Sequence, residues 1–170
     1  MINENSSRDE VLQLVKKCGC VLQYASKELQ NDREVVMAAV KDMGSAFRFV
    51  SHELREDKEI VMEATKTFPE AIGYSSPLRG DIDFLLELIK IRFEVFGHVD
   101  WKLERKKDFV LEAVKINIKC LRYVDEEFFK IKEVYAYEYD ERVKRKERDF
   151  LFELIKPHLK DEIVRELDDK

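Results

Sequence analysis

Three cysteines and three histidines are the side chains of this chain that could bind a metal ion or carry redox chemistry. Cys18 and Cys20 are separated by a single glycine, and Cys120 lies far along the chain. A structural zinc site needs four ligands, and no second pair of cysteines or histidines accompanies the first. Cys18 also falls in an apolar column of the repeat described below, which favours a buried small side chain. The sequence therefore predicts no metal and no cofactor, with redox work at this pair as the alternative.

Catalytic motifs are the next possibility, and the chain contains none that we recognise. It has no glycine-rich phosphate loop, no Gly-x-Ser-x-Gly nucleophile elbow and no His-Glu-x-x-His motif. The histidines at positions 52, 98 and 158 have no partner at zinc-ligand spacing. We therefore expect that the protein is not an enzyme. An unrecognised site, with His52 or His98 beside a carboxylate, is the alternative.

The sequence repeats itself with a period of about 25 residues, and this repetition must position whatever the chain uses for function. Five lysines each follow an acidic residue by seven positions and precede a bulky apolar residue by six. One residue is deleted from the period within 75–78, and 149–156 nearly copies 83–90. The lysines, with spacings of 25, 25, 24 and 25 residues, are Lys16, Lys41, Lys66, Lys90 and Lys115.

Each unit contains two segments with helical apolar spacing. In the second unit, residues 32–43 place their apolar side chains on one stripe of a helix. A second, shorter segment has apolar residues at i, i+3 and i+7, as in Phe47, Val50 and Leu54. Aspartates occupy the expected N-cap positions, where a carboxylate accepts hydrogen bonds from free backbone amides. These aspartates are Asp32, Asp57 and Asp81.

Glycine or proline separates the two segments in the first three units. We expect Gly19 and Gly44 to end the first helix in a left-handed conformation, and Pro69 to break it in the third unit. Phe93 takes this column in the fourth unit, which predicts a different turn there. Serines at segment ends, such as Ser7, are expected to cap helices.

Helices of 12 and eight residues are too short to be stable alone, so each unit must cover its apolar stripe by stacking on its neighbours. The sequence therefore predicts an all-α protein of tandem two-helix repeats, stacked as a short α-solenoid or curved helical array. We expect a flexible N-terminus over 1–6 and five repeats over 7–131. A charged, aromatic insertion, expected to be helical, follows over 132–148, and a sixth half-repeat with a C-terminal cap completes 149–170.

The repeat resembles that of a known helical family. The segments 32–44, 47–54 and 55–62 are similar to the repeats of the family called domain of unknown function 4116, and Tyr24–Leu29 matches the second segment of that repeat closely. The similarity is specific over 7–80, weaker over 81–131 and lost over 132–148. It implies tandem helical repeats, and no catalytic residues are carried over from it.

Charge and hydropathy exclude some partners. The chain has 31 basic and 36 acidic residues, a net charge of −5, whereas nucleic-acid binders usually present a basic surface. Five of the seven residues in 142–148 are basic, but acidic residues flank them, which favours a solvated helix face. The longest uncharged stretch, 18–26, is nine residues, too short for a membrane span of about 20. The odd cysteine count and the absence of a signal peptide favour a reducing cytoplasm, with delivery to another compartment or a host cell left open.

These observations favour a non-enzymatic scaffold or adaptor that binds a protein partner through its repeat surface. Binding of a nucleic acid or a phosphate surface through 142–148 is the alternative. One aromatic column, at positions 24, 49, 74, 98 and 123, could pack between repeats, which we favour, or form an exposed stripe. The candidate partner-binding residues are Tyr74, His98, Tyr123, Tyr135, Tyr137, Tyr139, Arg142, Lys144 and Arg145.

Overall fold

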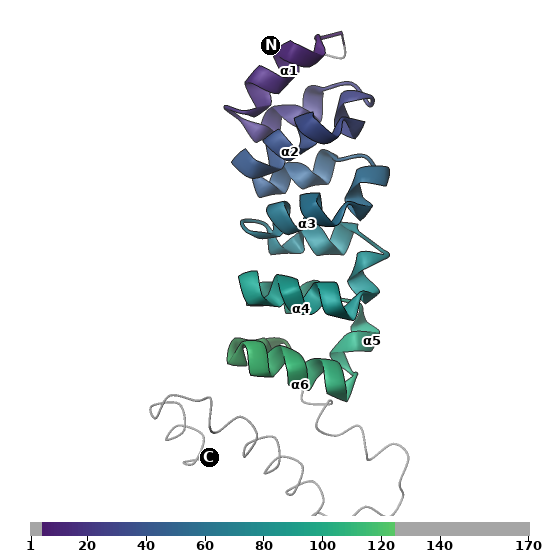
Figure 1. The fold of residues 1–170 in the computed structure, drawn as a ribbon, viewed down its shortest axis with the longest axis vertical. Coiled ribbons are helices and arrows are strands. Elements are labelled where there is room, and N and C mark those ends of the chain that lie inside the picture. The colour runs from purple at the N-terminus through teal and green to yellow at the C-terminus, as the bar shows by residue number, and fades with distance from the viewer. Residues whose placement is uncertain (1–4, 125–170) are drawn as a thin grey trace, which may run out of the picture. The chain divides into compact units, whose positions relative to one another are not determined.

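The computed structural model describes residues 5–124, and this part of the chain contains α-helices and 3₁₀ helices but no strand. The prediction of an all-α helical array is confirmed (Figure 1). Two compact units are present, the first ending at Asp100 and the second beginning at Trp101. The insertion predicted over 132–148 and the half-repeat predicted over 149–170 lie outside the described residues.

Each of the four repeats of the first unit contains an α-helix and a six-residue 3₁₀ helix, and the first three also contain a short 3₁₀ turn. The α-helices are α1 (Arg8–Val15), α2 (Arg33–Asp42), α3 (Lys58–Thr65) and α4 (Ile82–Ile91). The six-residue 3₁₀ helices are η1 (Gly19–Tyr24), η3 (Gly44–Phe49), η5 (Pro69–Tyr74) and η7 (Phe93–His98). The short turns are η2 (Leu29–Asn31), η4 (Glu53–Glu56) and η6 (Leu78–Gly80).

The second unit contains three described helices. A short helix, α5 (Trp101–Glu104), packs against α6 (Lys107–Ile116), and α6 packs against η8 (Ile118–Tyr123). The order of an α-helix followed by a six-residue 3₁₀ helix is therefore the same as in the first unit.

The second helical segment predicted in each repeat is present, but in the first three repeats it consists of two 3₁₀ segments instead of one continuous helix. The chain is extended between them, with φ −75° and ψ 156° at Ala25 and φ −70° and ψ 141° at Val50. The apolar spacing did not reveal this difference, because a 3₁₀ helix has three residues per turn and also brings residues i and i+3 to one side.

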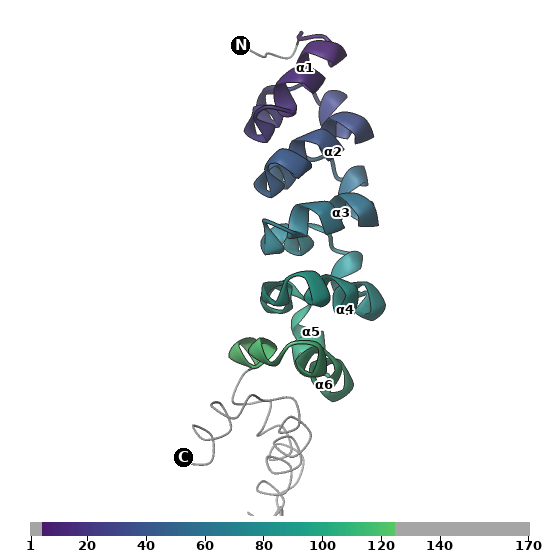
Figure 2. The same cartoon turned by 60° about the vertical axis from the view of Figure 1, so that its left-hand side comes forward.

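The helices of the first unit form two rows that share one core. Contacts join α1 to α2 and α2 to α3 in one row, and η1, η3, η5 and η7 in sequence in the other (Figures 1 and 2). The apolar stripes of the two rows meet between them. The side chains there are fully buried at equivalent positions of successive repeats. Examples at equivalent positions are Val36, Val61 and Leu85 in the α row and Phe47, Ile72 and Phe96 in the 3₁₀ row.

The aspartates cap their helices as predicted. Asp32 Oδ1 accepts hydrogen bonds from the Glu34 and Val35 amides, both at 3.0 Å. Asp57 and Asp81 accept equivalent bonds at the starts of α3 and α4. Ser7 forms a reciprocal capping box with Glu10 at the start of α1, which confirms the expectation for that serine.

The glycines between the helices have a different role from the one predicted. None of the described glycines has a positive φ, so Gly19 and Gly44 are not left-handed caps. Instead, each lies against the next α-helix. A Cβ on Gly44 would come within 2.4 Å of the Ala64 carbonyl oxygen, and one on Gly19 within 2.3 Å of the Ala39 carbonyl oxygen. These glycines are required for close packing between repeats.

The predicted change of turn in the fourth repeat is also wrong. Arg92 precedes Phe93 with φ −144° and ψ 107°, and Met43 precedes Gly44 with φ −142° and ψ 103°. An extended residue therefore ends the α-helix in both repeats, and the residue type that follows does not alter the turn.

Charged contacts link each α-helix to the next one along the first unit. The first residue of one helix is a cation that reaches the N-cap aspartate of its neighbour. The Arg8 Nε–Asp32 Oδ2 distance is 2.7 Å and the Arg33 Nε–Asp57 Oδ2 distance is 2.8 Å. This ladder was not predicted from the sequence. Its members are Arg8 with Asp32 and Glu34, Arg33 with Asp57 and Glu59, and Lys58 with Asp81.

The ladder lowers the pKa of the aspartates that it contains. The hydrogen bond from Arg8 is the largest cause for Asp32. For Asp57, partial burial raises the pKa, but the hydrogen bonds from Arg33 and from the helix amides outweigh burial, so the pKa is again lowered. The pKa of Asp81 is lowered mainly by the cation of the preceding helix. Each carboxylate therefore stays charged while it caps its helix.

Candidate functional site

The aromatic column lies at the C-terminal ends of the six-residue 3₁₀ helices. Tyr24 is 58% exposed and Tyr74 is 38% exposed, while Phe49 and His98 are partly buried. Tyr123 ends η8 in the second unit and is 38% exposed. The preferred prediction, that this column packs between repeats, is therefore wrong for Tyr24, which is mostly exposed, whereas Tyr74 is mostly covered.

The two tyrosines of the first unit differ in how they are held. The Tyr74 ring makes an edge contact with Phe47 at a centroid distance of 6.5 Å and a tilted contact with Phe68 at 6.1 Å. The Arg55 guanidinium lies 5.5 Å from the Tyr74 centroid, so the ring is braced on several sides. Within the described residues, Tyr24 makes no ring contact and no hydrogen bond, and its ring is free to meet a partner.

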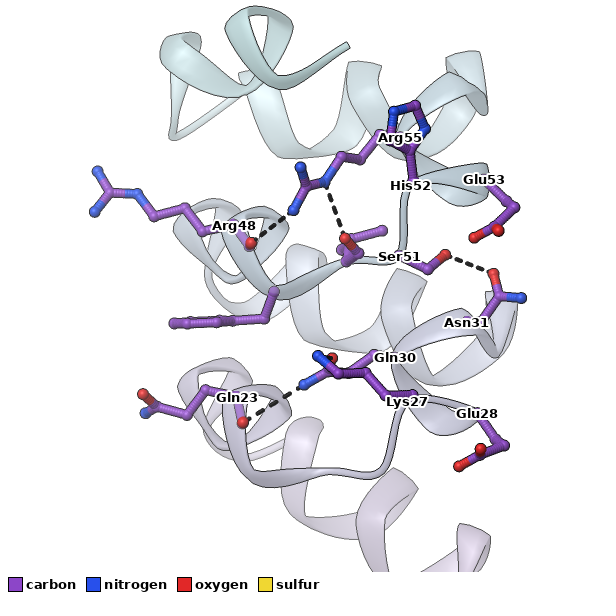
Figure 3. Close-up of a pocket in the computed structure, with 12 residues that line it drawn as sticks. Gln23, Lys27, Glu28, Gln30, Asn31, Arg48, Ser51, His52, Glu53 and Arg55 are labelled. Carbon is purple, nitrogen blue, oxygen red and sulfur yellow. Dashed lines mark hydrogen bonds between the residues drawn. The ribbon is translucent and has the colours of Figure 1, made fainter. Parts of the chain in front are cut away.

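A groove of about 680 Å³ lies between the first two repeats and includes Phe49 of the aromatic column (Figure 3). It is formed by residues of η1 and η2 on one side and of η3 and η4 on the other. Most of its lining is polar. The lining residues are Gln23, Lys27, Glu28, Gln30, Asn31, Arg48, Phe49, Val50, Ser51, His52, Glu53 and Arg55.

Two of these side chains hold the backbone that forms the groove. The Gln30 amide donates to the Leu22 carbonyl oxygen at 3.1 Å. Arg55 donates through Nε to the Val50 carbonyl oxygen and through Nη2 to the Arg48 carbonyl oxygen, both at 2.9 Å (Figure 3). These bonds satisfy carbonyls where the chain leaves each 3₁₀ helix, so the groove is a pre-formed feature of the fold.

The two walls of the groove are also joined directly. Ser51 donates its hydroxyl to Asn31 Oδ1 at 2.5 Å, and the Ser51 amide donates to the Gln30 carbonyl oxygen at 3.0 Å. Arg79 makes a comparable link further along, donating to the carbonyl oxygens of His98 and Val99 at 3.2 Å and 3.1 Å. Hydrogen bonds along the 3₁₀ row thus connect the first repeat to the second and the third repeat to the fourth.

Charges of both signs surround the groove. Lys27 and Arg48 contribute cations, and Glu28 and Glu53 contribute carboxylates. His52 also lines it, and Figure 3 shows its imidazole turned away from the Glu53 carboxylate. A general acid–base pair needs hydrogen-bond contact with its proton donor or acceptor. The groove therefore presents cations and carboxylates side by side.

The three cysteines fall into two environments. Cys120 is fully buried, and this burial raises the pKa of its thiol to about 12. Cys18 and Cys20 are only partly buried, and their sulfur atoms lie 2.6 Å apart. The prediction of a buried small side chain therefore does not hold for Cys18. No cluster of three or more metal-binding side chains occurs among residues 5–124.

The structure separates the predicted partner-binding residues. Tyr74 and His98 lie in one row of the first unit, and Tyr123 belongs to the second unit. The remaining predicted residues, Tyr135, Tyr137, Tyr139, Arg142, Lys144 and Arg145, are outside the described part. Sequence reasoning missed two features, the prominence of Tyr24 and the groove beside Phe49. The available signal was the recurrence of a polar residue inside each short turn, at Gln30, Arg55 and Arg79.

Comparison with known proteins gives one family match. The model of the family described as Domain of unknown function (DUF4116) matches three times in tandem, over residues 7–55, 36–79 and 57–104. No curated protein and no solved structure matches the chain. Among the described helices, none has both the length and the apolar character that a membrane span requires. The overlapping matches follow the period seen in the fold.

Proposed function

Because the chain belongs to the DUF4116 family, whose name assigns no molecular role, we propose a function from its surface: a non-enzymatic module that binds a protein partner along the 3₁₀ row of the first unit. The observation that carries this proposal is the exposure of two tyrosines of the aromatic column. Tyr24 has no ring contact within the described residues and is 58% exposed, and Tyr74 is 38% exposed two repeats further on. The row would act as one edge of an α-solenoid scaffold.

Aromatic residues are effective anchors because they bury a large area while losing little rotational freedom. Tyr74 is already held by Phe47, Phe68 and Arg55, so its ring loses less entropy on binding than an unsupported side chain. Tyr24 offers a free hydroxyl in addition. The row therefore carries one tyrosine that is held in place, Tyr74, and one that is largely exposed, Tyr24. Together they support binding along the row.

The charges around the groove favour a protein partner over a nucleic acid. Glu28 and Glu53 stand among the basic side chains and would repel phosphates. A polypeptide can satisfy both signs and can also hydrogen-bond to the amides of Gln23 and Asn31. Three free cysteines fit a reducing compartment as the place where the module works.

The test uses the full chain with a photo-crosslinking amino acid at position 24, and the same amino acid at position 101 as a control. Trp101 is 61% exposed, so it matches Tyr24 as an exposed aromatic residue outside the column. We expect position 24 to crosslink a discrete protein that position 101 does not. The captured protein, purified, is then titrated against variants.

The binding measurement compares the Tyr24→Ala, Tyr74→Ala double variant with Trp101→Ala. Loss of a hot-spot anchor costs about 2 kcal/mol or more, so the double variant should bind at least roughly 30-fold more weakly. Trp101→Ala should bind as the parent does. Equal affinities for the parent and the double variant would refute the proposed surface. Tight binding of DNA or RNA at about 50 mM salt, with no captured protein, would favour the nucleic-acid alternative.

A further inference from the structure

The pair Cys18 and Cys20 is the cluster that the proposed function leaves unused. Their sulfur atoms are 2.6 Å apart, whereas a disulfide bond is roughly 2.05 Å long. The two side chains therefore point at each other from either side of Gly19. Both are partly buried, so reagents from solvent can reach them.

Packing does not explain the residue at position 20. The equivalent positions of the next three repeats hold polar residues, Ser45, Glu70 and Glu94. By contrast, Cys120 is equivalent to the buried residues Ala46, Ala71 and Val95, and is itself fully buried. The chain thus contains one cysteine that fills the core and two that do not, and the latter two are in contact.

The backbone holds the pair in this arrangement. Cys18 is extended, with φ −154° and ψ 96°, and η1 begins at the following residue. The Gly19 amide donates to Asp42 Oδ2 at 2.7 Å, and the glycine Cα lies against the Ala39 carbonyl of α2. The second repeat therefore anchors the residue between the two thiols, and little backbone movement is needed to join the sulfurs.

We propose that Cys18 and Cys20 form a reversible dithiol–disulfide site that small disulfides such as oxidised glutathione act on. In the first step, the Cys18 thiolate attacks one sulfur of oxidised glutathione, and one glutathione thiolate leaves. In the second, the Cys20 thiolate attacks Cys18 Sγ, forming the Cys18–Cys20 bond and releasing the second glutathione. The two thiols lose two protons and two electrons, and two reduced glutathione molecules carry them away.

The order of attack follows from the local contacts. The hydrogen bond that the Cys20 thiol donates to Cys18 is the largest cause that raises the pKa of Cys20, with partial burial and the negative charges of Cys18 and Asp42 acting in the same direction. Cys20 therefore holds its proton more tightly while Cys18 is the thiolate. This makes Cys18 the first nucleophile and Cys20 the resolving thiol. Cys20 shares η1 with Tyr24, but the chemistry of the two thiols does not depend on the proposed partner surface.

The experiment equilibrates the full chain with mixtures of reduced and oxidised glutathione, quenches with acid, and measures mass. The expected product at high oxidised glutathione is a chain lighter by two hydrogen atoms, with the bond mapped to the peptide that contains Cys18 and Cys20. Cys20→Ser should accumulate one glutathione on Cys18, because no resolving thiol remains. Cys120→Ser should behave as the parent chain does.

A second measurement needs no oxidant. Phenylarsine oxide bridges two neighbouring thiols and resists removal by excess monothiol, so the parent chain should retain one arsenic atom. Cys18→Ser and Cys20→Ser should both release it. A parent chain that holds glutathione without forming the internal disulfide, that dimerises through these cysteines, or that stays unmodified would overturn the proposal. Loss of arsenic from the parent chain at the same rate as from the serine variants would do the same.

Discussion

Substitution of Gly44 by alanine tests the close packing between repeats more directly than any other single change. The added Cβ would lie 2.4 Å from the Ala64 carbonyl oxygen and 2.4 Å from Thr67 Oγ1. Thr67 is exposed, so its side chain can rotate away, but the Ala64 oxygen belongs to the backbone of α3. The second and third repeats must therefore move apart to accept the methyl group.

The cost follows from three contributions. Overpacking a close contact costs roughly 1–3 kcal/mol. Displacing Thr67 weakens the 3.1 Å hydrogen bond from the Gly44 amide, at about 0.5–1.5 kcal/mol. Alanine also reduces the conformational entropy of the unfolded chain, which stabilises the folded state by about 0.4–1 kcal/mol. This gain applies because φ at Gly44 is not positive, so alanine can adopt it without strain. The expected net loss in the free energy of unfolding is about 2 kcal/mol.

Gly73 provides the matched control, because a Cβ there would have no neighbour within 4 Å and its φ is also not positive. Gly73→Ala should leave stability unchanged or raise it by up to about 1 kcal/mol. Urea unfolding followed by circular dichroism measures both variants, with equal m-values as the check that the same surface unfolds. If Gly44→Ala is as stable as Gly73→Ala, the repeats do not approach each other as closely as described. Adding Thr67→Ala to Gly44→Ala should restore little stability, since the backbone oxygen remains.

Two further predictions concern the core and the charged ladder. Leu88→Asp should lower the free energy of unfolding by several kcal/mol, because it places an unpaired charge at a fully buried site. Leu14→Asp, at the equivalent but 40% exposed position of the first repeat, should lower it much less. Similar melting temperatures for the two variants would contradict the shared core. The pKa values of Asp32 and Asp57 are lowered in the folded state, so their contribution to stability is complete above the ordinary carboxyl pKa of about 4 and is lost as the pH falls below it. Asparagine keeps the cap but binds no proton, so the Asp32→Asn, Asp57→Asn variant should show a shallower loss of stability between about pH 5 and pH 3. If the variant and the parent chain lose stability with pH at the same rate, the two aspartates do not cause the acid dependence.

The repeat order and the helix starts could be predicted because they depend on residues close together in the sequence. Asp32 and Asp57 precede apolar stripes at a constant offset, and a cap needs only the amides of the next turn. The type of the second segment could not be predicted in this way. Phe47 and Val50 are three residues apart, and that spacing is compatible with an α-helix and with a 3₁₀ helix alike.

Contacts between repeats were the main source of error. Gly44 was expected to serve its own helix end, but its role depends on a carbonyl oxygen 20 residues further on, at Ala64. The exposure of Tyr24 depends on how η1 is rotated about its axis, which an aromatic column alone does not determine. For the ladder the signal was present, because a cation follows the cap in Asp32–Arg33 and in Asp57–Lys58, but its partner lies one repeat away.

The ladder has a consequence for how proteins of this kind can change in length. The second and third repeats each offer a cation to the repeat after them and a capping aspartate to the repeat before them, so either of these repeats can follow the other in the same direction. Removal of residues 33–57 would join Asp32 to Lys58 and leave Arg8 facing an aspartate cap as before. Duplication of the same segment would add one more rung. Gain or loss of such repeats can therefore vary the length of the array while each junction that they form keeps its charge pairing.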